Sequence, residues 1–256
     1  KAQHRDAILL YRLGDFYEMF GEDALTASKT LEIVLTKRNF GDNTTLPMCG
    51  VPHHSADSYI AKLLENGHKV AVAEQTEEPD KGKKLVAREV VRIITPGTDL
   101  DADRLDAGRN NYLMAVAEGR DRFGIAMLDV STGEFSAGEV PRGGAGGPLL
   151  REIERIAPRE CIVSSQDGGG SLCQRISERF SELKLNEIDI LFDPAYHRDS
   201  LCDHFGVKSL HGFGIQDMPL AVTAAGQELE YVRENLKSPP KQINSISLYS
   251  PHDSMY

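Results

Sequence analysis

Short apolar runs of strand length alternate with amphipathic segments of helical spacing along the whole chain. The first hundred residues contain such runs at 8–13, 70–73 and 90–94, with helical spacing between them. This alternation is typical of α/β domains, in which helices cover a sheet. A chain of 256 residues is long enough for two domains, each with its own core. We therefore predict the α/β fold class and two domains.

Residues 95–98, Thr-Pro-Gly-Thr, mark the predicted boundary between the domains. Pro and Gly end the preceding strand, and the acidic stretch at 99–103 has no apolar face. We predict a first domain over 1–100, a linker over 101–111, a second domain over 112–237, and the start of a truncated third unit over 238–256. The chain begins at Lys1 and ends in Ser-Met-Tyr, which indicates a fragment of a longer protein.

In the first domain, Asp15 is predicted to open a helix. The apolar positions at helical spacing behind it are Phe16, Phe20, Ala24, Ala27 and Leu31. Asp15 and Glu18 have the spacing of a capping box, and on this pattern Phe16 is a core residue. Residues 32–37 are rich in strand formers. Ser55 is predicted to cap a second helix that ends before Gly67.

The second domain repeats the alternation without repeating the sequence. We predict a hairpin turn at 131–134 between two strands, and a helix that stops before Pro158. The predicted strands are 112–117, 124–130 and 161–163, and the predicted helices are 149–156, 175–183 and 224–236.

The net charge of −10 argues against a generally basic nucleic-acid coat protein. Residues 1–100 hold 13 Lys+Arg and 15 Asp+Glu, a balance of −2, so −8 falls on the rest. A local basic face in the first domain is compatible with this balance. No apolar run reaches membrane-spanning length and no signal peptide is evident, so we expect a cytoplasmic protein that contacts no membrane.

The four cysteines, at 49, 161, 173 and 202, form no Cys-x-x-Cys pair, which argues against a zinc knuckle and favours reduced thiols. Gly-x-Ser-x-Gly, His-Glu-x-x-His, Walker A and dinucleotide-binding patterns are all absent from the sequence. The pair His53-His54 has no neighbouring ligand residues and is expected in a polar loop. We expect no enzymatic activity, metal or cofactor in this chain.

An ordered series of motifs carries a family resemblance. Residues 14–20 read Gly-Asp-Phe-Tyr-Glu-Met-Phe, and Leu-Thr-Lys-Arg follows at 35–38. Further matching stretches lie at 47–54, 71–75 and 88–98. This series resembles the N-terminal domain of MutS, the family of DNA mismatch-recognition ATPases. Residues 128–135 and 212–214 are similar, more weakly, to the connector domain of that family.

The resemblance implies a small mixed α/β mismatch-binding domain followed by a ribonuclease H-like α/β connector domain. It also implies that Phe16 stacks on a mispaired base from the minor groove and that Glu18 hydrogen-bonds the same base. An inserted aromatic ring unstacks a base step and kinks the duplex. A mispair has already lost part of its stacking, so deforming it costs less free energy.

The resemblance further implies that Lys37 and Arg38 contact the DNA backbone. A solvated charge pair is the ordinary alternative for such residues. Met48 is either a core residue or an apolar minor-groove contact, and we favour the contact. The basic loop at 81–84 is expected to be a solvated tip.

By the same resemblance, the partners are mismatched double-stranded DNA and a MutL-type protein bound through the connector. ATP, magnesium and homodimerisation belong to the full-length protein, and the fragment is expected to be monomeric. Ribonuclease H-like enzymes hold two metals with clustered carboxylates. Asp129, Glu134 and Asp167 do not assemble into such a cluster. The alternative function is binding of branched or recombination DNA, but relatives with that use typically lack the Phe-x-Glu pair.

Overall fold

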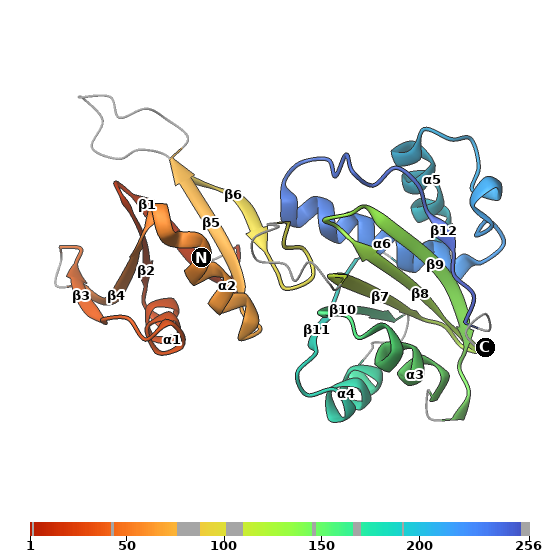
Figure 1. Cartoon of the computed structure of the whole chain (residues 1–256), viewed down its shortest axis with the longest axis horizontal. Coiled ribbons are helices and arrows are strands. Elements are labelled where there is room, and N and C mark those ends of the chain that lie inside the picture. The colour runs from red at the N-terminus through yellow and green to blue at the C-terminus, as the bar shows by residue number, and fades with distance from the viewer. Residues whose placement is uncertain are drawn as a thin grey trace. The chain divides into compact units, whose positions relative to one another are not determined.

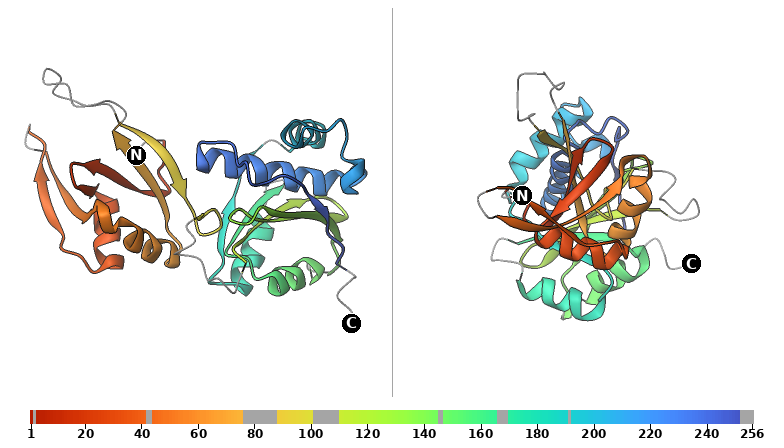
Figure 2. Two further views of the ribbon diagram at one scale, coloured as in Figure 1. Left: turned by 45° about the horizontal axis from the view of Figure 1, so that its top comes forward. Right: turned by 90° about the vertical axis from the view of Figure 1, so that its left-hand side faces the viewer.

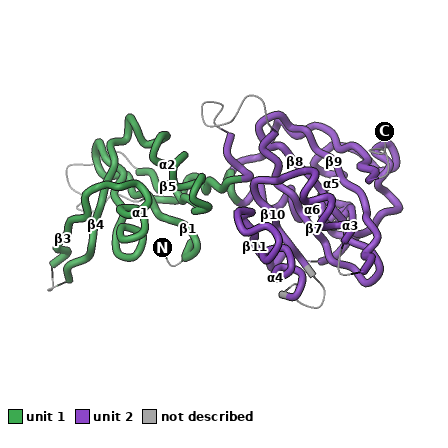
Figure 3. The backbone as a smooth tube through the Cα atoms, turned by 60° about the horizontal axis from the view of Figure 1, so that its bottom comes forward, with its two compact units in different colours: residues 1–96, 235–237 green, residues 97–234, 238–256 purple. Residues whose placement is uncertain are grey.

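The computed structural model describes residues 1, 3–41, 44–75, 88–100, 110–144, 147–165, 170–190 and 192–251 (Figure 1). The chain divides into two compact units, residues 1–96 with 235–237 and residues 97–234 with 238–256 (Figure 3). The basic loop at 81–84, Asp167 and the predicted linker up to residue 109 lie outside the described residues. None of the helices in the described part is long and apolar enough to cross a membrane.

Unit 1 is built on a six-stranded sheet in the order β3-β4-β2-β1-β5-β6. β1 pairs in parallel with β5, and the other neighbours pair antiparallel. The strands are β1 Ala7–Leu13, β2 Phe16–Phe20, β3 Thr36–Asn39, β4 Thr45–Pro52, β5 Lys69–Gln75 and β6 Arg88–Ile94.

Two helices of unit 1, α1 (Glu22–Leu31) and α2 (Ala56–Glu65), share a single core with the sheet (Figure 2). The core takes alternate residues of β1, β2, β4 and β5 and the apolar stripes of both helices. Ser55 stands at the N-cap of α2 as predicted, but its hydroxyl donates to the carbonyl of Pro52 instead of capping the helix. Gly67 follows α2 with a positive φ of 73°.

The predicted helix does not begin at Asp15: α1 starts at Glu22 and buries the predicted Ala24, Ala27 and Leu31, whereas Phe16 and Phe20 belong to β2. Gly14, with a φ of 59°, and Asp15 form a two-residue loop between β1 and β2, so Leu13 pairs with Phe16. Glu18 lies opposite residues of β1 and β4 and caps no helix. A spacing of four residues places Phe16 and Phe20 on one face of a strand as well as of a helix, which explains the error. The strand-forming segment after α1 also begins later than predicted, at Thr36.

Unit 2 contains a second six-stranded sheet in the order β11-β10-β7-β8-β9-β12. β7, β8 and β9 form an antiparallel meander, and β10 and β11 extend it in parallel from β7. β12 pairs in parallel with β9 at the other edge. The strands are β7 Tyr112–Glu118, β8 Arg122–Asp129, β9 Glu134–Pro141, β10 Glu160–Ser165, β11 Lys184–Glu187 and β12 Ser247–Leu248.

Helices cover both faces of this sheet. α3 (Gly147–Ile156) and α4 (Gly170–Arg179) share one apolar cluster with alternate residues of β7, β8 and β10. On the opposite face the backbone of α6 (Pro219–Leu236) approaches β8 so closely that a Cβ at Gly124 would overlap the carbonyl group of Leu220 (Figure 1). The α/β fold class is thus confirmed for both units.

Several elements of unit 2 differ from the prediction. α4 begins at Gly170, earlier than the predicted 175, and α6 begins at Pro219, earlier than 224. α5 (Pro194–Phe205) was not predicted, because it has little amphipathic pattern, although Asp193 caps it by accepting from two backbone N–H groups. Beyond α6, Ile243 and Ile246 are buried and β12 follows, so this stretch packs as part of unit 2.

Candidate nucleic-acid interface

The sheet face of unit 1 opposite α1 and α2 carries the predicted recognition residues of β2. Along β2, Tyr17 and Met19 enter the helix-covered core, so Phe16, Glu18 and Phe20 lie on the other face. Phe16 is 47% exposed, a high value for a large apolar side chain in a paired strand. Because β1 and β4 both hydrogen-bond to β2, this aromatic ring stands on a backbone fixed from both sides.

Glu18 forms an ion pair with Arg38 of β3, whose guanidinium Nη1 donates to the carboxylate Oε2. The guanidinium also lies over the ring of Phe20, 5.9 Å from its centroid, and over the ring of Phe40, 5.8 Å from its centroid. The two rings meet edge to face at 5.4 Å. The structure therefore brings Phe16, Glu18 and Arg38 onto one face. Phe20, which the sequence pattern assigned to a helix, joins them there, and so does Phe40, which sequence reasoning did not single out.

Gly50 of β4 lies directly opposite Glu18. A Cβ at this position would lie 3.3 Å from the carbonyl oxygen of Tyr17, 3.6 Å from the Glu18 side chain and 3.8 Å from the Phe16 ring. The missing side chain leaves room beside both recognition residues. The matching stretch at 47–54 pointed to this segment, but the reason for the glycine became visible only with the strand register.

Lys37 and Arg38 lie on opposite faces of β3. In the β3–β4 register Arg38 pairs with Leu46 and Lys37 with Pro47, and successive residues of a strand point to opposite sides. Met48 pairs with Phe20 and is half-buried, so it belongs to the face of Phe16. Contact of Lys37, Arg38 and Met48 with DNA stays a prediction.

On the covered side of β2, Tyr17 is fixed by its surroundings. Its hydroxyl donates to the carboxylate of Glu74, and its ring lies 5.4 Å from that of His53. Burial, together with the hydrogen bond and negative charge of Glu74, raises the pKa of Tyr17 to about 12. The backbone N–H of His53 donates to the carbonyl of Asp15 at 2.8 Å, which ties the start of α2 to the β1–β2 loop.

The carboxylates considered for a metal site in unit 2 have other partners. Asp129 accepts from the backbone N–H of Ser131 in the β8–β9 turn at 2.9 Å through Oδ1, and from that of Asn111, just before β7, at 3.0 Å through Oδ2. Glu134 accepts from the Asn110 amide at 3.0 Å. Within the described ranges, no three His, Cys, Asp or Glu residues form a group suited to a metal ion.

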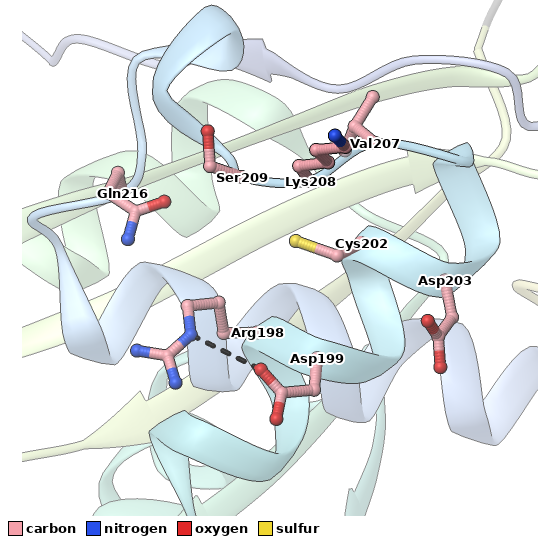
Figure 4. A pocket seen from close by; sticks show the side chains of 8 residues that line it. All are labelled: Arg198, Asp199, Cys202, Asp203, Val207, Lys208, Ser209 and Gln216. Carbon is pink, nitrogen blue, oxygen red and sulfur yellow. Dashed lines mark hydrogen bonds and ion pairs between the residues drawn. The ribbon is translucent and has the colours of Figure 1, made fainter.

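A pocket on unit 2 lies beside α5 and the segment that follows it (Figure 4). Arg198 and Asp199 form an ion pair at its edge, with 3.4 Å between Nε and Oδ1. Burial and the nearby Asp199 carboxylate raise the pKa of the Cys202 thiol. The remaining lining residues are Asp203, Val207, Lys208, Ser209 and Gln216. This pocket has no equivalent among the sequence predictions.

Comparison with known proteins identifies both halves of the chain. The family model described as MutS domain I matches residues 1–103, and that described as MutS domain II matches residues 111–246. The DNA mismatch repair protein MutS of Desulfatibacillum aliphaticivorans is 44% identical over 252 residues, covering 97% of this chain and 28% of the relative. The protein of the same name from Syntrophobacter fumaroxidans is 45% identical over 260 residues, covering 100% of this chain and 28% of the relative. The chain thus spans less than a third of the length of these relatives.

Proposed function

The chain belongs to the MutS family, and we propose that it is the mismatch-reading and connector part of a DNA mismatch-repair protein. Relatives with the name DNA mismatch repair protein MutS align with 97% and 100% of this chain. The observation that carries the finer proposal is the half-exposed Phe16 beside Glu18 on the sheet face opposite the helices of unit 1.

Phe16 acts as a wedge that enters the minor groove and stacks on a mispaired or unpaired base. Its strand is paired on both sides, so the ring meets the duplex from a rigid support and little conformational entropy is lost on binding. Inserting the ring unstacks one base step and kinks the DNA. The kink costs less free energy at a mispair, so discrimination comes from DNA deformability.

Glu18 adds specificity by accepting a hydrogen bond from the displaced base. An anion close to phosphates opposes binding, so the carboxylate disfavours a well-stacked duplex that offers it no donor. Met48 adds apolar contact on the same face, and Lys37 of β3 contacts the phosphate backbone of the DNA. Replacing Glu18 with Ala or Gln is expected to lower discrimination without weakening binding to matched duplex.

The connector unit carries signals between the DNA reader and the rest of the full-length protein, and it contacts a MutL-type partner. ATP and magnesium act in a motor domain of the full-length protein, which is a homodimer. The present chain matches the first two family domains. We propose that it is monomeric by itself and has no ATPase activity of its own. The compartment that we propose for it is the cytoplasm.

The wedge is tested with Phe16→Ala in the full-length protein. Tyr196→Ala, which removes an aromatic ring of similar exposure (45%) from α5, is the matched control. Fluorescence anisotropy with mismatched and matched duplexes should show a loss of mismatch affinity of roughly 5- to 100-fold for Phe16→Ala, the range for losing one base–aromatic stack. Equal mismatch affinity for wild type and Phe16→Ala would overturn the wedge. Tighter binding to a four-way junction than to a mismatch would favour the branched-DNA alternative.

A further inference from the structure

We propose that Arg38 is a positioning residue for Glu18, which holds one carboxylate oxygen so that the other is presented to a mispaired base. This inference rests on the proposed function of Phe16 and Glu18. It assigns Arg38 a role in discrimination, in place of the phosphate contact that the family resemblance implied.

The first observation is how the Glu18 carboxylate is occupied. Oε2 accepts from Arg38, while Oε1 has no hydrogen-bond partner among the described residues. The Glu18 side chain is only 18% exposed, against 43% for Arg38, so the carboxylate is the more enclosed member of the pair. An ionised carboxylate only accepts hydrogen bonds, so the base that meets Oε1 must bring an N–H donor.

The second observation is how Arg38 is itself held. Its guanidinium lies over Phe20, two residues along β2 from Glu18, and over Phe40, which follows β3. Contacts with two aromatic faces restrict a side chain that otherwise has many rotamers. Phe20 also meets Tyr11 of β1 edge to face, with ring centroids 6.4 Å apart, so the support extends into the neighbouring strand. The Arg38 side chain is therefore held in place by its contacts, unlike an unpaired cation on the surface.

The third observation is the contrast with the adjacent cation. Lys37 is exposed on the opposite side of β3 and makes no ion pair with a described residue. A lysine in this situation can approach a phosphate as a point charge. Arg38 would have to leave a carboxylate and two rings to do the same. The two basic residues of one tetrapeptide thus have different tasks, which supplies a matched control one residue away.

The planar guanidinium matters for this arrangement. Arginine can donate to a carboxylate while its flat faces rest on aromatic rings, whereas a lysine ammonium keeps the charge without the fork or the plane. Arg38→Lys should therefore restore part of the discrimination lost in Arg38→Ala. A role limited to neutralising charge would be fully restored by lysine.

The test uses the full-length protein and measures dissociation constants for a mismatched and a matched duplex over a range of salt concentrations. Arg38→Ala should lower the mismatch-to-matched affinity ratio by roughly three- to tenfold, within the range for weakening one hydrogen bond of ordinary strength. The slope of log affinity against log salt should stay as in wild type. Lys37→Ala should weaken both duplexes equally and reduce that slope by about 1.

A double-mutant cycle then links the two residues. Once Glu18→Ala has removed the carboxylate, adding Arg38→Ala should change the affinity ratio no further, because residues that act as one unit are not additive. Independent losses in the double variant would overturn the proposal. So would equal weakening of both duplexes by Arg38→Ala with a reduced salt slope.

The outcomes also separate this inference from the function on which it rests. If Phe16→Ala leaves mismatch binding unchanged, the proposed function fails. If Phe16→Ala abolishes mismatch preference while Arg38→Ala keeps the wild-type affinity ratio, only the positioning role of Arg38 fails. Thermal unfolding of each variant verifies that the exposed β3–β4 hairpin still forms.

Discussion

The two sheets differ in how their faces are covered, and the burial pattern along their strands reflects this difference. In unit 1, α1 and α2 pack against the same face, and the strands β2 and β4 alternate between buried and more exposed residues. In unit 2, helices cover both faces, and β7 and β8 are buried almost throughout. The face of the unit 1 sheet opposite α1 and α2 is more exposed at β2 and β4 and keeps that area for a ligand, although Ala7, Leu9, Ala71 and Ala73 of β1 and β5 are buried on it. A doubly covered sheet is a scaffold whose sites must lie on its helices and loops.

The helix-covered faces of unit 2 are themselves unequal. Large residues such as Met114, Phe123 and Ile125 meet α3 and α4. Small residues, Ala115, Ala126 and Gly124, occupy alternate positions on the side of α6, next to the larger pair Leu113 and Leu128. Small side chains let the α6 backbone approach the sheet closely, so tight packing in unit 2 should be far less tolerant of change than the recognition face of unit 1.

The largest effect is expected from Gly124→Ala. The added Cβ would overlap the carbonyl of Leu220, so α6 must move away from the sheet, at a cost of about 3 kcal/mol or more. Gly50→Ala is the matched control, because its Cβ meets nothing nearer than 3.3 Å, and it should change stability by less than about 1 kcal/mol. Denaturant unfolding measures the free energy of unfolding of the two variants. Hydrogen exchange then shows whether the loss lies in unit 1 or in unit 2. Equal stability of the two variants would contradict the contrast between the sheets.

The next effect concerns Glu228 on α6, whose two carboxylate oxygens are buried without a hydrogen-bond partner among the described residues. Burial raises the pKa of this carboxyl well above its usual 4.5. The folded state then binds the proton more tightly than the unfolded state, so Glu228 lowers stability increasingly as pH rises above about 4.5. Glu228→Leu should stabilise unit 2 by about 1–3 kcal/mol at pH 7, and less at pH 4.

Glu234→Leu is the control for this change, since Glu234 is exposed on the same helix. In thermal unfolding from pH 4 to pH 8, the gain in stability over wild type should grow with pH for Glu228→Leu. For Glu234→Leu the difference from wild type should be small and independent of pH. A gain at residue 228 that is independent of pH would rule out titration of this carboxyl as the cause.

The smallest effect is expected beneath the recognition face. Tyr17→Phe removes the hydroxyl that donates to Glu74 and should destabilise unit 1 by about 1 kcal/mol. The pKa of Tyr17 is raised to about 12, so its stabilising contribution is complete below pH 10 and is lost as pH rises toward 12. The variant should therefore lose less stability than wild type between pH 9 and pH 12.

Tyr59→Phe on α2 serves as its control, because the Tyr59 hydroxyl makes no hydrogen bond to a described residue. Circular dichroism melts at pH 7 and pH 11 measure all three proteins. If Tyr17→Phe and Tyr59→Phe behave alike at both pH values, the Tyr17–Glu74 bond does not stabilise unit 1.

Much of the fold was predictable from local pattern. The strands near 70–73, 90–94, 112–117 and 161–163 are confirmed, because continuous apolar runs bounded by turn residues have few alternatives. The segment after Asp15 was predicted as helix because a spacing of four residues fits one face of a helix and one face of a strand equally well. The turn at Gly14 makes this segment the strand β2. α5 and β12 escaped prediction because their stability comes from contacts with distant parts of unit 2 and not from an amphipathic pattern.

For the candidate site, the sequence by itself determined which residues are present and in what order. The motif series at 14–20, 35–38 and 47–54 identified the segment, and Phe16 and Glu18 within it. Only the tertiary structure decided that β2 lies between β1 and β4, that Gly50 faces Glu18, and that Arg38 and Lys37 take opposite faces. The reason is physical: the pairing of β2 with β4 joins residues 28 to 36 positions apart, from Phe20 with Met48 to Phe16 with Pro52. Neither propensity nor spacing within one segment encodes that register.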